Sequence, residues 1–186
     1  YNLAVGVTAL DAVTTGDYNT ALGYSSLTDN TTGTSNAAYG SQSLFKNTTG
    51  NRNTAFGHQS MHQNTEGSHN TAVGYLTLKN TTANSNTAVG NLAMTENISG
   101  VDNVALGMSA LRNSTASNYN TAIGKRALYD ANRTADSDGY NIAVGYAAGY
   151  TGTNNITTGN KNTLLGASTA AASASGTNQT VIGYGA

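Results

Sequence analysis

The sequence contains no proline, cysteine or tryptophan, and only 9% of its 186 residues are charged. Without cysteine, no disulfide framework can form. The formal net charge of −1 excludes the basic surface that binding to phosphates requires, so we expect no nucleic-acid partner. No apolar run reaches the length of about 18 residues that a spanning helix needs, so we expect no membrane insertion.

Large aliphatic residues are also sparse, and asparagine, threonine, serine, glycine and alanine dominate the chain. Low hydrophobicity often indicates disorder, but disordered chains usually combine it with proline and a high net charge. Neither is present here. We therefore expect a folded chain that relies on extensive backbone hydrogen bonding.

The chain is built from an internal repeat. The string Asn-x-Ala-φ-Gly, where φ is apolar, recurs at a spacing of 17 residues in most copies, 16 in one and 21 in two. The last two copies are looser, NTLLG from Asn162 and QTVIG from Gln179. Such self-similarity is the signature of stacked repeat units. We interpret residues 1–186 as a single array within a longer chain, with 21-residue variants at 120–140 and 141–161.

Conserved offsets within the repeat predict columns of equivalent residues. A glycine closes the string in all eleven copies, and a leucine or methionine stands four residues later from Leu10 to Leu128. Gly149 and Ala170 replace it in later copies. We expect the small residues to form a structural ladder, whose members include Asn19, Ala21, Gly23, Asn53, Ala55, Gly57, Asn70, Ala72 and Gly74.

Strand alternation places Thr and φ on one face of the string and Asn, Ala and Gly on the other. We expect φ to join the Leu/Met column in a narrow core, and a second short strand to form around the Ala-Leu pair. The predicted fold is all-β, a repetitive parallel β-solenoid or β-roll of about eleven 17-residue coils. An outward face of small residues suits close approach of another backbone, which predicts a homotrimeric fibre.

The segments NTALGYSSL (19–27) and NTAVGYLTL (70–78) resemble the repeat region of phage tail-fibre proteins. The wider pattern is similar to the β-roll head of trimeric autotransporter adhesins, although the coil here is longer. The resemblance covers nearly the whole chain. It implies a structural extension that lies in the extracellular space, on a cell surface or on a virion. Its partners would be further copies of itself, as a homotrimer or filament, and a host-surface glycan or protein.

No catalytic constellation is present, so we predict a protein that is not an enzyme and holds no cofactor. His58 and His62 are four residues apart, a spacing that serves a metal only on a helix, and solvated side chains are the simpler interpretation. Asp136 and Asp138 precede Gly139 in an incomplete calcium pattern that lacks the downstream glutamate. A polar surface loop is the simpler interpretation there.

Two further sets of residues could act at the surface. Tyr24, Tyr75 and Tyr146 each follow the column glycine; they could bind sugars by stacking, although packing over strand edges is the favoured alternative. Glycosylation sequons recur in the polar loops, where glycans would fit, for example at Asn30, Asn47 and Asn97.

Three functions therefore remain open. The first is the shaft or adhesin segment of an extracellular or virion fibre, which projects or forms an attachment site. The second is a glycan- or matrix-binding module that acts through repeat loops and tyrosine rows. The third is an ice-binding solenoid, but its threonine column is broken at Leu3, Ala37, Val104 and Ile142.

Overall fold

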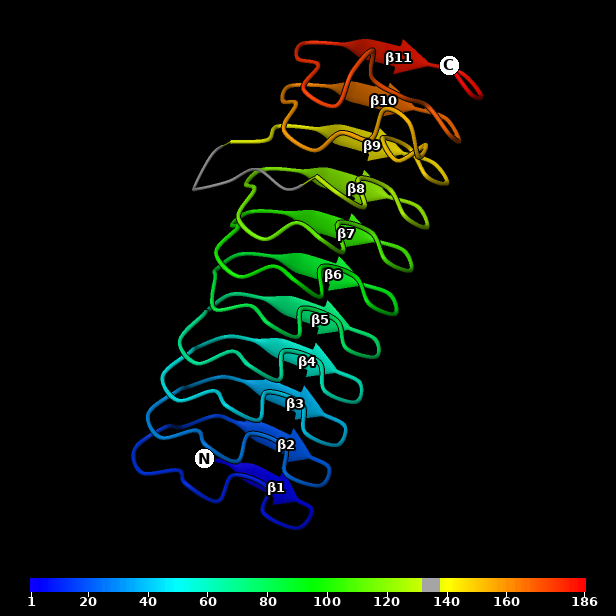
Figure 1. The fold of residues 1–186 in the computed structure, drawn as a ribbon. Helices are drawn as coiled ribbons and strands as arrows, with labels where there is room; N and C mark the ends of the chain where they lie inside the picture. Colours follow the sequence, from blue (N-terminus) through cyan, green and yellow to red (C-terminus); the bar gives the residue numbers. More distant parts are fainter. Residues whose placement is uncertain (132–137) are drawn as a thin grey trace.

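The computed structural model describes residues 1–131 and 138–186, and it shows one elongated stack of coils (Figure 1). Each coil contributes one three-residue strand, and the eleven strands pair in parallel in chain order within one sheet. The predicted all-β parallel solenoid is confirmed. The strands are β1 (Leu3–Val5), β2 (Thr20–Leu22), β3 (Ala37–Tyr39), β4 (Thr54–Phe56), β5 (Thr71–Val73), β6 (Thr87–Val89), β7 (Val104–Leu106), β8 (Thr121–Ile123), β9 (Ile142–Val144), β10 (Thr163–Leu165) and β11 (Thr180–Ile182).

The register of the sheet follows the repeat without a slip. Equivalent residues pair between neighbouring strands, as in Ala55 with Ala72 of the next coil. The pairing also holds across the 16-residue copy, where Thr71 meets Thr87, and across a 21-residue copy, where Ala122 meets Ala143. Length differences are therefore absorbed by the loops, and the strands stay stacked.

The interior of the coil is the reverse of the predicted one. The strand alanine and the Leu/Met column are fully buried, as at Ala55 and Met61, while Phe56 of the φ column is 57% exposed. The prediction that φ fills the core is therefore wrong, and so is the outward face of small residues. A coil this short encloses a narrow space, which alanine, one long aliphatic side chain and asparagine fill, so the larger φ residue has to face outward.

The predicted second strand around the Ala-Leu pair is also wrong. This part of the coil forms tight turns in which Ser25 and Leu27, like their equivalents in other coils, have left-handed backbones with φ of 51° and 50°. Such a conformation costs an L-residue about 1–2 kcal/mol. Hydrogen bonds between coils offset this cost: the Ser25 N–H donates to Val7 O at 2.9 Å, and the Leu27 N–H donates to Ser43 O at 3.0 Å.

The core changes where the Leu/Met column ends. Gly149 stands in the column, and a Cβ added there would lie 2.8 Å from Leu128 Cδ2. The apolar volume comes instead from Ile156 and Leu164, both fully buried. Ile156 belongs to the longer copy at 141–161, so its insertion supplies a core residue as well as a loop.

Candidate functional site

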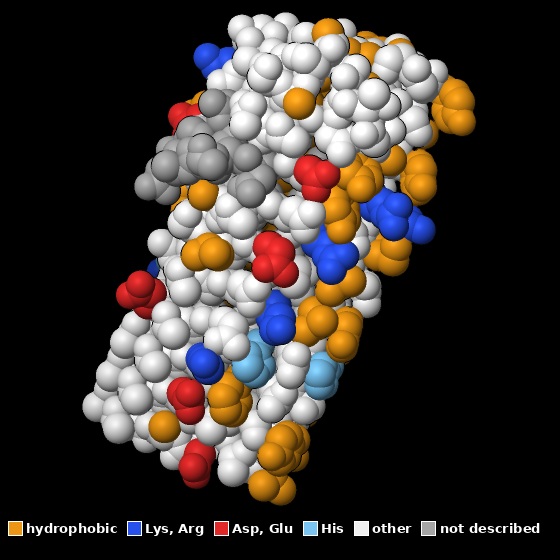
Figure 2. Space-filling view, viewed as in Figure 1, with side chains coloured by type: hydrophobic (Ala, Val, Ile, Leu, Met, Phe, Trp, Pro, Cys, Tyr) orange, Lys and Arg blue, Asp and Glu red, His pale blue; other side chains and the backbone are white. Residues whose placement is uncertain are grey.

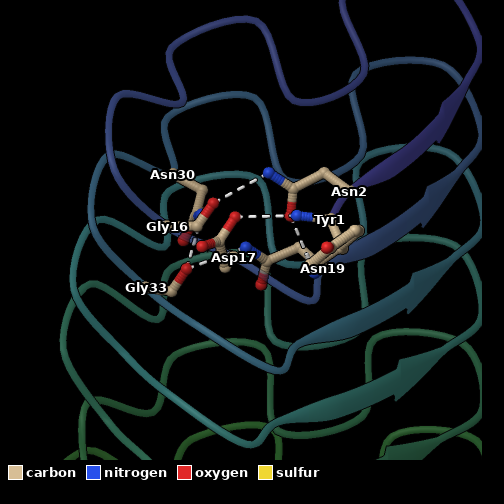
Figure 3. Close-up of polar contacts among 7 residues, drawn as sticks. All are labelled: Tyr1, Asn2, Gly16, Asp17, Asn19, Asn30 and Gly33. Carbon is tan, nitrogen blue, oxygen red and sulfur yellow. Dashed lines mark hydrogen bonds and ion pairs between the residues drawn. The ribbon is translucent and has the colours of Figure 1, made fainter.

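A ladder of buried asparagine side chains runs along the inside of the coils, and Figure 3 shows its first steps. Asn19 Nδ2 donates to Gly33 O at 2.8 Å, while Asn19 Oδ1 accepts the N–H of Asn36 at 3.0 Å. Each side chain thus closes its own coil and joins it to the next. The buried members are Asn19, Asn36, Asn53, Asn70, Asn86, Asn103, Asn120, Asn141 and Asn162.

A second asparagine ladder, which was not predicted from the sequence, lies in the NTTG turns. Asn47 Nδ2 donates to Asn30 Oδ1 at 2.8 Å and to Gly50 O at 3.0 Å. Asn64 repeats both contacts one coil later. The recurrence of this asparagine in the turns was the available signal. Because Asn30, Asn47 and Asn97 are fully buried, the interpretation of these sequons as loop sites for glycans is wrong.

This second ladder requires a glycine three residues after each asparagine. A Cβ on Gly50 would collide with Asn47 Oδ1. The coil that carries Ser114 in place of the asparagine also carries Ser117 in place of the glycine. The ladder is interrupted at Thr81 and again at Ser114. These breaks leave Asn64 Oδ1, Asn97 Oδ1 and Ser114 Oγ buried without a hydrogen-bond partner among the described residues.

The ladder can be extended by one coil. The double variant Ser114→Asn with Ser117→Gly is expected to stabilise the fold by about 1 kcal/mol, because an amide at 114 can donate to Asn97 Oδ1. Asn120 Nδ2 loses Ser117 Oγ as an acceptor but keeps Asn103 Oδ1 and Asn118 O. Ser114→Asn alone is expected to destabilise the fold, because the Ser117 Cβ occupies the space of the new Oδ1. Urea unfolding of the double variant and both single variants measures the coupling. If the changes in unfolding free energy of the two single variants simply add up to that of the double variant, the proposed coupling between positions 114 and 117 is wrong.

The outward surface of the sheet exposes large apolar side chains, among them Phe56, Leu106 and Leu165, and we call it the strand face. It consists of the Thr column and the φ column, and neither column contains a charged residue. In Figure 2, exposed hydrophobic side chains follow one long edge of the molecule. Extended apolar surface of this kind marks a site of interaction. The φ column comprises Val5, Leu22, Tyr39, Phe56, Val73, Val89, Leu106, Ile123, Val144, Leu165 and Ile182.

Tyrosine rows border the strand face on both sides. Tyr24, Tyr75 and Tyr146 are all exposed, and the ring of Tyr75 stacks on His58 with centroids 5.6 Å apart. On the opposite border, Tyr119 and Tyr140 stack at 4.9 Å with nearly parallel rings. The rows thus combine ring-on-ring packing between coils with side chains that are available for contact.

The histidines make local contacts. His62 stacks on Phe45 at 5.2 Å, and its Nδ1 lies 2.8 Å from Gln63 Nε2. The pKa of His62 is lowered from its ordinary value by burial and then by the charges of Lys79 and Lys46, so the neutral imidazole is favoured. Across residues 1–131 and 138–186, no three His, Cys, Asp or Glu side chains are grouped as a metal site would need.

The proposed calcium pair is only partly placed. Asp136 lies outside the described residues. Asp138 accepts a hydrogen bond from the hydroxyl of Tyr140. Partial desolvation raises the pKa of Tyr140, and this hydrogen bond and the charge of Asp138 raise it further.

Comparison of the chain with family models, curated proteins and solved structures gives no match. The resemblance to fibre and adhesin repeats therefore stays a prediction. The described part of the chain contains no helix capable of crossing a bilayer. Any functional assignment depends on the ladders, the strand face and the tyrosine rows.

Proposed function

We propose that this chain is a non-catalytic shaft segment of an extracellular or virion fibre, in which the strand faces of several copies pack together. One observation carries the proposal: the φ column is apolar in every coil, yet it faces outward. Leu106 remains 46% exposed in the isolated chain. Monomeric soluble proteins rarely expose contiguous apolar patches larger than a few hundred Å², and this face has no charged residue in either column.

We assign contact between copies of the chain to the strand face, in place of the small residues predicted from the sequence. The Asn/Ala/Gly face cannot meet a partner, because Ala55, Asn53 and their equivalents are buried inside their own chain. A homotrimer remains the proposed assembly, with the φ columns directed toward its axis. Burial of apolar area at about 25 cal/mol per Å² would drive that association.

The internal construction suits a mechanical role. Neighbouring coils are joined by parallel strand pairing, by hydrogen bonds between turns and by the two asparagine ladders. Stability in such an array comes from contacts between adjacent coils, so a shaft can be lengthened by adding repeats. Three aligned copies would also present three tips, and avidity would follow.

A charge placed on the strand face tests this proposal. Light scattering of the wild-type chain is expected to give the mass of a trimer. Leu106→Lys is expected to weaken association at least about tenfold, because like charges would meet in an apolar contact.

The matched control is Ile98→Lys, which places the same charge at an apolar residue that is 52% exposed but lies in a loop outside the strand face. This control is expected to keep the wild-type mass. A wild-type chain that stays monomeric at all concentrations would overturn the packing proposal, as would equal effects of the two lysines.

The binding-module function remains a second candidate. The observation that favours it is the exposure of the tyrosine row that contains Tyr24, Tyr75 and Tyr146. Of these three tyrosines, Tyr146 also lines a groove.

A further inference from the structure

The longer copy at 141–161 builds a feature that the regular coils lack. Its extra residues leave the stack as a loop over residues 150–155, which is closed at its base by the Ile156 N–H donating to Gly149 O at 2.9 Å. Within the loop, the Gly152 N–H donates to Asn155 Oδ1 at 2.7 Å. The loop is therefore folded back on itself and anchored by Ile156 in the core.

A groove of about 320 Å³ lies between this loop and the edge of the strand face. The edge contributes Arg126, Tyr146 and Ser168, and the loop contributes Tyr150 and Thr151. The groove thus combines one guanidinium, two phenol rings and two hydroxyl groups. A concave site with a few convergent polar groups is the usual form of a small-ligand site.

A larger hollow of about 780 Å³ shares Thr151 and Ser168 with the groove but opens on the final coil. Gln179 and Val181 line it, and they occupy the Asn and Ala columns that are interior in the preceding coils. This hollow is the open end of the stack, so it gives no evidence of a ligand.

We propose that the groove of Arg126 and Tyr146 binds an acidic saccharide. Arg126 is exposed, and among the described residues its guanidinium has no hydrogen-bond or ion-pair partner. Arg112 is different, because it donates to Tyr129 Oη at 2.9 Å. A guanidinium offers paired donors that match a carboxylate in a bidentate geometry.

The charge around the groove favours an anion. None of the residues that line it is acidic, and Lys125 precedes Arg126 in the chain. Asp130 lies at the base of the inserted loop, but its two carboxylate oxygens accept from Asn113 Nδ2 at 2.8 Å and from Asn155 Nδ2 at 3.0 Å. Asp130 is thus engaged with two amides, and Arg126 is left to pair with a ligand.

The aromatic rings favour a sugar over a simple anion. Tyr146 is 52% exposed, and the ring of Tyr150 packs against that of Tyr129 with centroids 4.7 Å apart and the planes tilted by 37°. The C–H face of a pyranose packs on such rings, while its hydroxyl groups can pair with Thr151, Ser168 and the phenols. Because one chain forms the whole groove, this proposal does not depend on the proposed trimer.

The test is a nuclear magnetic resonance titration of the isotope-labelled full chain with three probes. They are methyl β-D-glucuronide, the neutral methyl β-D-glucoside, and sodium acetate. We expect saturable shifts at Arg126, Tyr146 and Thr151 with the glucuronide, and affinity at least about tenfold weaker for the other two probes. Arg126→Gln and Tyr146→Ser are each expected to reduce glucuronide affinity about tenfold.

Tyr24→Ser is the matched control, since Tyr24 holds the same column position and is 58% exposed but lies outside the groove. It is expected to leave the affinity unchanged, and unaltered strand amide shifts verify the fold of each variant. The proposal is overturned by an absence of saturable shifts, by acetate binding as tightly as the glucuronide, or by groove variants that bind like the wild type. The light-scattering result for Leu106→Lys stays separate, so the two proposals fail independently.

Discussion

Replacing Gly74 with alanine is expected to destabilise the fold by about 4 kcal/mol or more, through a backbone clash added to backbone strain. Gly74 has φ of +136°, and a Cβ there would lie 2.7 Å from the carbonyl oxygen of Gly90 in the next coil. That carbonyl cannot easily move, because it accepts the Thr77 hydroxyl at 2.6 Å. Urea unfolding measures the loss, and hydrogen exchange locates it around β5 and β6.

Gly152→Ala is the control that separates strain from collision. Gly152 also has a left-handed backbone, with φ of +89°, but no atom lies within 4 Å of an added Cβ. Its cost is therefore expected to be strain alone, about 1–2 kcal/mol. If Gly74→Ala lowers the free energy of unfolding no more than Gly152→Ala does, the conclusion that successive coils approach too closely for a side chain at the column glycine is wrong.

The second large effect is expected from Asn53→Ala, at about 2–4 kcal/mol, because a buried polar group left unpaired costs about 1–3 kcal/mol and a second lost hydrogen bond adds about 1 kcal/mol. Asn53 Oδ1 accepts the Asn70 N–H at 3.0 Å, and Asn53 Nδ2 donates to Gly67 O at 2.7 Å. Alanine leaves the Asn70 N–H buried without this acceptor and removes one of the two donors to Gly67 O, which keeps the hydrogen bond from Asn64 Nδ2 at 3.0 Å. It also opens a small cavity. The midpoint of urea unfolding provides the measurement.

Thr54→Ala is the matched control for Asn53→Ala, at the next residue of the chain, where β4 begins. Thr54 is on the exposed side of β4, so its replacement is expected to change stability by no more than about 0.5 kcal/mol. If Asn53→Ala is as stable as Thr54→Ala, the buried Asn53 amide contributes no more to the free energy of unfolding than a solvent-exposed amide would.

The sequence by itself determined the period, the strand at each Asn-x-Ala-φ-Gly string and the register, whereas the second strand that it predicted in each coil does not form. Asn, Ala and Gly recur at fixed offsets, and only in-register stacking brings each set into contact with itself. The glycine column was predictable for the same reason, since a residue such as Gly74 recurs where coils approach too closely for a side chain. These features depend on local chemistry that every copy repeats, so each copy reinforces the inference.

Only the tertiary structure decided which side of each strand is inside. Alternation shows that Thr54 and Phe56 share a face, but it does not say whether the coil closes on that face or away from it. Hydrophobicity favoured Phe56 inside, whereas the narrow cross-section accepts Ala55 and Met61 and closes over two amide ladders. The groove beside Arg126 could not be predicted from the sequence either. It forms because the loop over residues 150–155 projects from the stack and lies next to a neighbouring coil.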